Sequence, residues 1–150
     1  MRALLAIFAL GWVLLPAGIV RASNGSDPTV WTGVVLATSE TNRTAPLEKL
    51  APYAAKLENI FGYTHFVLLG EHTEIMDDPH EHWLVPGHSF SLMAASERST
   101  AALGYSVKLE LFRERRMLVA TKVWLSPRNP LFIKGPLCGR GQLIIILVVQ

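Results

Sequence analysis

The sequence lacks three features that would point to a function. It has one cysteine, Cys138, so no disulfide can form within the chain. Its charge is nearly balanced, with 14 Lys and Arg against 12 Asp and Glu, and a nucleic-acid partner is not expected without a clear basic excess. No catalytic motif is present, because residues 87–91 place a histidine beside serines without forming Gly-x-Ser-x-Gly. We therefore predict a protein that is not an enzyme.

The N-terminus has the pattern of an export signal. A positive residue precedes an apolar run at residues 3–15, which Pro16-Ala17-Gly18 interrupts. This order is typical of a secretory signal peptide, so we expect residues 1–22 to be removed by cleavage after Ala22. The protein would then be secreted or periplasmic, with no membrane contact after cleavage. The alternative is an uncleaved N-terminal membrane anchor, because residues 3–20 are just long enough to span a bilayer.

Removal of the signal would leave a single domain of ordinary size. Residues 23–28 are mainly small and polar and predict a flexible start, so the domain spans residues 29–150. Residues 23–97 contain ten acids and three bases, whereas residues 98–150 contain nine bases and two acids. Either these segments lie side by side and neutralise each other, or the surface is dipolar and favours self-association or a charged partner.

The clearest alternation of apolar and polar residues lies between Tyr105 and Leu125, with a charged break at residues 113–116. Such a pattern predicts a β-hairpin. A loop over residues 114–116 places Leu111 opposite Val119, Leu109 opposite Thr121 and Val107 opposite Val123, which makes one face apolar. A two-residue turn would place Val107 opposite Lys122, so we expect the three-residue loop.

Residues 46–61 have the pattern of an amphipathic helix that Gly62 ends. Pro52 either kinks this helix or marks a true start near Ala51, with the earlier residues in a separate turn. The apolar stripe consists of Leu47, Leu50, Ala54, Leu57 and Phe61.

Short apolar segments predict the remaining strands at residues 29–38, 63–69, 83–85, 88–93, 131–134 and 143–149. Residues 143–149 are apolar throughout, so this strand should lie inside the sheet with both faces covered. The order of elements predicts an α+β fold: a single small domain in which one amphipathic helix packs on a twisted, mainly antiparallel β-sheet of hairpins.

Acidic and histidine residues crowd residues 71–82, which we expect to form a loop. Imidazole and carboxylate groups are ligands for zinc, copper or nickel, so the loop is a candidate site for a transition metal ion. The spacing matches no established metal motif, and a solvent-exposed polar loop or a pH-sensitive loop would use the same residues. The candidate ligands are His72, Glu74, Asp77, His80 and His82.

One face of the predicted hairpin is both aromatic and basic, and it carries Lys108, Phe112, Lys122 and Trp124. Either this face is an exposed binding surface or the helix of residues 46–61 covers it. We predict an exported, non-catalytic binding or assembly module that uses this face for a protein partner or for self-association. The alternative is a metal-binding exported protein that uses residues 71–82.

Overall fold

The computed structural model describes residues 27–39, 48–77, 80–87, 90–97 and 104–150. The predicted signal peptide, and the predicted flexible start up to residue 26, lie outside the described residues.

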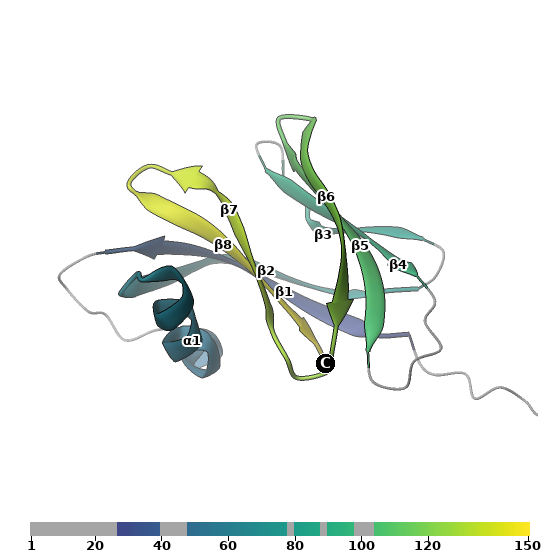
Figure 1. Cartoon of the computed structure of the whole chain (residues 1–150), viewed down its shortest axis with the longest axis horizontal. Coiled ribbons are helices and arrows are strands. Elements are labelled where there is room, and N and C mark those ends of the chain that lie inside the picture. The colour runs from purple at the N-terminus through teal and green to yellow at the C-terminus, as the bar shows by residue number, and fades with distance from the viewer. Residues whose placement is uncertain (1–26, 40–47, 78–79, 88–89, 98–103) are drawn as a thin grey trace, which may run out of the picture.

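Two four-stranded antiparallel sheets make up most of this part of the chain (Figure 1). Sheet A has the strand order β2-β1-β8-β7, and sheet B has the order β3-β4-β5-β6. The strands are β1 (Thr29–Thr38), β2 (His65–Ile75), β3 (Glu81–Val85), β4 (Ser91–Glu97), β5 (Tyr105–Arg113), β6 (Arg116–Leu125), β7 (Leu131–Cys138) and β8 (Gly141–Val149).

The single sheet predicted from the sequence is therefore wrong, although the antiparallel hairpins and the one helical segment are confirmed. Alternation along a strand shows which residues share a face, but it does not show which hairpins belong to one sheet. The helical segment consists of η1 (Glu48–Leu50) and α1 (Ala51–Phe61), and it packs on the face of sheet A that points away from sheet B (Figure 1). The fold thus has three layers: helix, sheet A and sheet B.

The central strand β8 explains how sheet A is covered on both sides. Ile144 and Ile146 pack with Leu57 of α1, whereas Ile145 and Leu147 pack with residues of sheet B. All four of these β8 side chains are fully buried. The prediction that this apolar strand lies inside a sheet is confirmed. The core between the two sheets contains Val30, Met76, Leu84, Leu92, Ala94, Val107, Leu109, Leu111, Leu125, Ile145, Leu147 and Val149.

Helix α1 begins at Ala51 with Pro52 in its first turn, and the preceding turn is the separate 3₁₀ segment η1. This confirms the second of the two interpretations of Pro52. The helix ends at Gly62, whose φ of 74° is left-handed and whose N–H donates to the carbonyl of Glu58 at 2.8 Å. In the described part of the chain, neither helical segment has the length or the apolar run that crossing a bilayer requires.

The β5–β6 hairpin has the predicted pairs but a different loop. Leu111 lies opposite Val119 and Val107 opposite Val123, as expected. The turn, however, is the two-residue Glu114-Arg115, and both residues have positive φ, 48° and 67°. A register shift between Leu111 and Phe112 takes up the extra residue, so the apolar face is kept despite the shorter turn.

The prediction that residues 71–82 form a loop is wrong in its extent. Strand β2 continues to Ile75 and β3 begins at Glu81, so most of the predicted loop belongs to these two strands. Both strands are sheet edges. One side of an edge strand has no neighbour, so charged and polar residues that suggest a loop are tolerated there.

Candidate functional site

The four residues of the predicted binding surface lie together on the outer face of sheet B. Lys108 is paired with Lys122 across β5 and β6, and Phe112 lies further along the same face of β5. Trp124 is paired with Ser106 and is 47% exposed. Because α1 packs on sheet A, the predicted alternative that the helix covers this face is wrong.

Trp83 on β3 belongs to the same face, although it was not among the residues predicted for the surface. Its side chain is 48% exposed, and its ring lies 5.8 Å from the ring of Phe112 at an angle of 54°. Its neighbour Leu84 is buried between the sheets, so Trp83 points to the outer face of sheet B. A hollow of about 580 Å³ opens beside the two rings, and Pro86, Gly87, Ser91 and Arg115 complete its lining.

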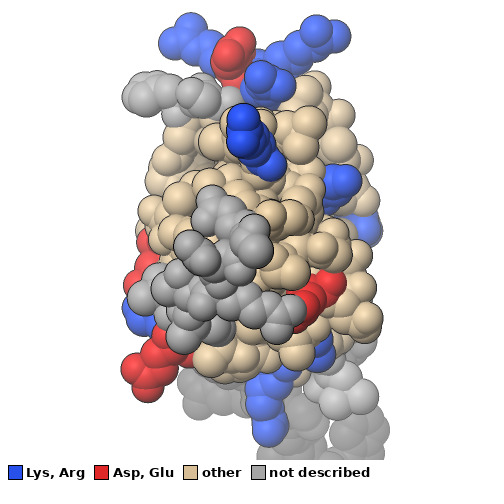
Figure 2. All heavy atoms as spheres, turned by 90° about the vertical axis from the view of Figure 1, so that its left-hand side faces the viewer, with Lys and Arg blue, Asp and Glu red and all other residues tan. Residues whose placement is uncertain are grey.

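Basic side chains gather at the end of sheet B where the β5–β6 turn lies. Arg113, Arg115 and Arg116 are exposed there, with Glu114 as the acidic residue of the turn. Figure 2 shows Lys and Arg side chains concentrated at this end of the molecule. On the face itself, Lys108 Nζ lies 2.5 Å from Oε1 of the nearly buried Glu110. The surface therefore carries aromatic side chains on β3, β5 and β6 and is cationic toward one end.

The candidate metal ligands are brought together where the edge strand β2 of sheet A lies next to the edge strand β3 of sheet B. The Nε2 atom of His72 lies 2.8 Å from Glu74 Oε2, and Glu74 Oε1 lies 3.3 Å from Nδ1 of His82. The other ring nitrogen of His82 lies 2.8 Å from Asp77 Oδ1, and Asp77 Oδ2 lies 2.9 Å from Nδ1 of His80. The five residues form an alternating histidine and carboxylate chain, which we call the edge network.

The edge network lowers the pKa of both of its carboxyl groups, Glu74 and Asp77. The pKa of Glu74 is lowered mainly by its hydrogen bond with His72, against a smaller opposing effect of burial. Burial acts to raise the pKa of Asp77, but the hydrogen bond and charge of His80 and the charge of His82 together lower it. Both carboxylates are thus favoured in their ionised form.

The edge network does not have the form of a metal centre. Within the described ranges, no group of three or more His, Cys, Asp or Glu side chains is arranged so that it could hold a metal ion. The ring nitrogens instead lie against carboxylate oxygens in successive pairs. A metal would require the side chains to leave these partners and converge on one point.

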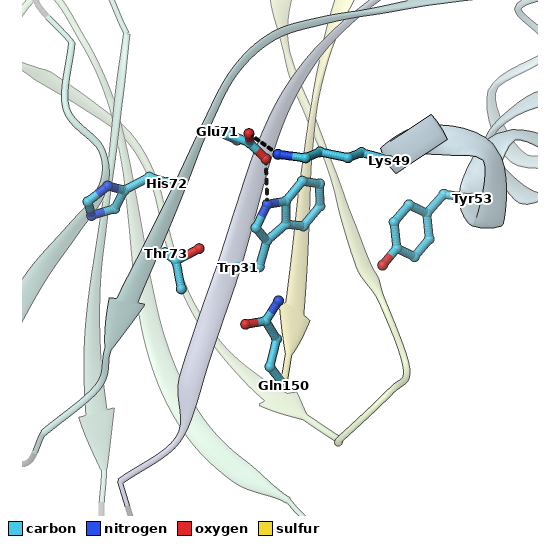
Figure 3. Close-up of a pocket in the computed structure, with 7 residues that line it drawn as sticks. All are labelled: Trp31, Lys49, Tyr53, Glu71, His72, Thr73 and Gln150. Carbon is cyan, nitrogen blue, oxygen red and sulfur yellow. Dashed lines mark hydrogen bonds and ion pairs between the residues drawn. The ribbon is translucent and has the colours of Figure 1, made fainter. Parts of the chain in front are cut away.

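A pocket of about 550 Å³ lies between the helical segment and sheet A (Figure 3). The indole N–H of Trp31 donates to Glu71 Oε2 at 3.0 Å, and Lys49 Nζ forms an ion pair with Oε1 of the same carboxylate. The hydrogen bond with Lys49, followed by that with Trp31, lowers the pKa of Glu71. Tyr53, His72, Thr73 and Gln150 also line the pocket, and the imidazole of His72 points away from the two aromatic rings (Figure 3).

The strand at Trp31 was predicted from the sequence, but this pocket was not. One signal was Gly33, two residues after Trp31 and therefore on the same face of β1. A β-carbon at Gly33 would lie 2.5 Å from the Cη2 atom of Trp31, so the glycine provides the space in which the indole lies. Residues from β1, β2, the helical segment and the C-terminus meet here, and no local pattern relates them.

Comparison of the chain with known protein families, with curated proteins and with solved structures finds no match.

Proposed function

We propose that the protein is an exported, non-catalytic binding or assembly module that engages a partner protein through the outer face of sheet B. The observation that carries the proposal is the exposure of Trp83 and Trp124. Each side chain is about half exposed, and both lie on the face of sheet B that points away from sheet A and α1. Tryptophan supplies a large rigid contact area and is enriched among the residues that dominate the energy of protein interfaces.

The width of the surface favours a macromolecular partner over a small ligand. Trp83 lies on β3 and Trp124 on β6, which are the two edges of sheet B. Three strand spacings separate them, or about 14 Å at roughly 4.8 Å per spacing. A partner that contacts both indoles must therefore extend across the whole sheet, as a protein surface does.

The charge at one end of the surface indicates the character of the partner. Arg113, Arg115 and Arg116 are exposed at the β5–β6 turn, and Arg115 lines the aromatic hollow. Exposed charges at the rim of an interface mainly increase the association rate and select a partner of opposite sign. The partner should therefore present apolar side chains bordered by acidic residues, and its association should slow as salt is added.

The proposal is tested first by photo-crosslinking. Ala120 is exposed and lies on the outer face of sheet B opposite Glu110, so a photoreactive amino acid at this position would face the partner. We expect an adduct with one discrete exported protein. The matched control is the same group at Ile60, which is 58% exposed on α1 at the other side of the molecule. Adducts of equal yield from both positions would contradict the proposal.

Variants of the two tryptophans then measure the energy of the contact. Trp83→Ala and Trp124→Ala should each weaken binding of the crosslinked partner by about tenfold or more. Ile60→Ala should leave the affinity unchanged. An adduct between two copies of this chain would assign the face to self-association, and wild-type affinity in the double tryptophan variant would exclude the face as the interface.

The export part of the proposal has its own test. N-terminal sequencing of the protein recovered from the host should begin at Ser23. A mature chain that retains residues 1–22 in the membrane fraction would support the alternative of an N-terminal anchor.

The alternative function, metal binding by an exported protein, relies on the edge network. It is tested by calorimetric titration of zinc and copper into the protein, beside a His80→Ala/His82→Ala variant. Tight stoichiometric binding that the double substitution abolishes would support the alternative, whereas binding of the protein partner should be indifferent to chelators.

A further inference from the structure

We propose that the pocket formed by Trp31, Lys49, Tyr53 and Glu71 (Figure 3) binds a neutral saccharide. The pocket lies on the helix side of sheet A and shares no residue with the surface proposed for the protein partner. The two proposals can therefore fail independently of each other.

Two aromatic rings provide the apolar part of the site. The rings of Trp31 and Tyr53 are nearly parallel, at 19°, with their centroids 6.1 Å apart. Each side chain is only partly buried, so both rings contribute to the pocket wall. The indole is held in position by its hydrogen bond to Glu71 and by its close fit over Gly33. A flat aromatic wall gives close dispersion contact with the C–H face of a sugar ring.

Polar groups surround the aromatic wall on several sides. Glu71 presents carboxylate oxygens and Lys49 presents an ammonium group, which is 62% exposed as a side chain. Thr73 adds a hydroxyl and Gln150 adds an amide (Figure 3). Donors and acceptors thus occur together. This mixture suits hydroxyl groups, because each hydroxyl can donate one hydrogen bond and accept others.

The charge balance of the pocket favours a neutral ligand that forms hydrogen bonds. Lys49 and Glu71 are paired and neutralise each other. An anionic ligand would meet the Glu71 carboxylate, and a cationic ligand would meet the Lys49 ammonium. A purely apolar ligand would remove these groups from water without replacing their hydrogen bonds, which is unfavourable. The volume of about 550 Å³ is within the usual range for small-molecule sites.

The test is a titration with maltotriose, cellotriose and chitotriose, followed by NMR through the indole N–H resonances. A Trp31→Phe variant identifies the Trp31 signal. We expect this signal to shift saturably with at least one of the trisaccharides, while the other indole signals stay in place. Glycerol, choline and inorganic phosphate serve as matched probes: a polyol without a ring, a cation and an anion.

The probes give outcomes that decide the proposal. No shift of the Trp31 signal with any of the three trisaccharides would overturn it. A saturable shift with choline or phosphate would also overturn it, because the pocket would then select charge. A response to glycerol equal to that of the trisaccharides would overturn it as well, because a polyol without a ring has no face to pack on the aromatic wall.

Variants then relate the binding to the lining residues. Tyr53→Ala should lower the affinity for the trisaccharide that binds by about tenfold. Glu71→Gln keeps the shape of the side chain and should lower this affinity by a smaller factor. Leu137→Ala, at the exposed end of β7, should have no effect. The amide spectrum shows whether Tyr53→Ala remains folded. If it does not, the Glu71→Gln titration decides alone, and unchanged affinity there would overturn the proposal.

Discussion

The imidazole of His82 on sheet B lies 3.3 Å from the carboxylate of Glu74 on sheet A, so a hydrogen bond joins the two sheets at their shared edge. The side chain of His82 is 11% exposed and that of Glu74 is 35% exposed. Both ring nitrogens of His82 face carboxylate groups, Glu74 on one side and Asp77 on the other. The edge network therefore links the two sheets through side chains of β2 and β3.

Removing the charge of Glu74 should weaken this contact. We expect Glu74→Gln to lower the free energy of unfolding by up to about 1 kcal/mol, a modest amount because the carboxylate is partly exposed to water. Chemical denaturation at neutral pH measures the effect. Glu81→Gln is the matched control, since Glu81 is an exposed carboxylate at the start of β3, and its unfolding free energy should equal that of the wild type.

Stability should decrease under acidic conditions. The pKa values of Glu71, Glu74 and Asp77 are all lowered in the folded protein. The folded state then binds fewer protons than the unfolded state, so the stabilisation is complete above the unfolded pKa of about 4 and is lost as the pH falls through the folded values. Urea denaturation over this range should show the loss. A Glu71→Gln/Glu74→Gln/Asp77→Asn variant should lose less, and an identical acid profile would contradict the assignment.

Gly104 lies against Trp124, and alanine should not fit there. A β-carbon at this position would lie 2.2 Å from Nε1 of Trp124 and 2.7 Å from the carbonyl oxygen of Leu125. We expect Gly104→Ala to destabilise the protein by about 1–3 kcal/mol, because backbone as well as side chain must move. Gly70→Ala is the control, since no atom lies within 4 Å of a β-carbon there. Equal melting temperatures for the two variants would show that the indole lies elsewhere.

The β5–β6 turn has residues that disfavour its conformation. Glu114 and Arg115 both have positive φ, which Asn-Gly adopts readily in a two-residue turn. We expect Glu114→Asn/Arg115→Gly to stabilise the protein by about 1 kcal/mol. A Glu114→Ala/Arg115→Ala variant removes the same charges without relieving the conformation, so it should give no gain in thermal denaturation. A gain in both variants would attribute the effect to charge.

The central strand should be the most sensitive to loss of volume. Ile145 is fully buried between the sheets, so Ile145→Ala should cost about 2–5 kcal/mol. Leu137 is an apolar side chain of similar size on the neighbouring strand, and it is 73% exposed. Leu137→Ala should therefore change the free energy of unfolding by less than about 0.5 kcal/mol. A comparable cost at both positions would contradict the observed order of strands in sheet A.

The predicted binding surface was accessible to sequence analysis because it depends on alternation. Lys108 and Phe112 are separated by four residues on β5, so their side chains must share a face. The pairing of Lys108 with Lys122 followed from the need to align the apolar residues on the other face. Trp83 was missed because it joins the surface through β4, and the order of strands in sheet B is not written in any local pattern.

The sequence by itself determined the local features: where most strands and the helix lie, where Gly62 ends the helix, which residues pair in the β5–β6 hairpin, and that β8 is covered on both faces. These follow from residue size, polarity and backbone conformation over short distances. Only the tertiary structure decided that there are two sheets, that the helix covers sheet A, and that Trp31, Tyr53 and Glu71 meet in one pocket. Those arrangements depend on contacts between segments far apart in the chain, and a local pattern of apolar residues is compatible with several such arrangements.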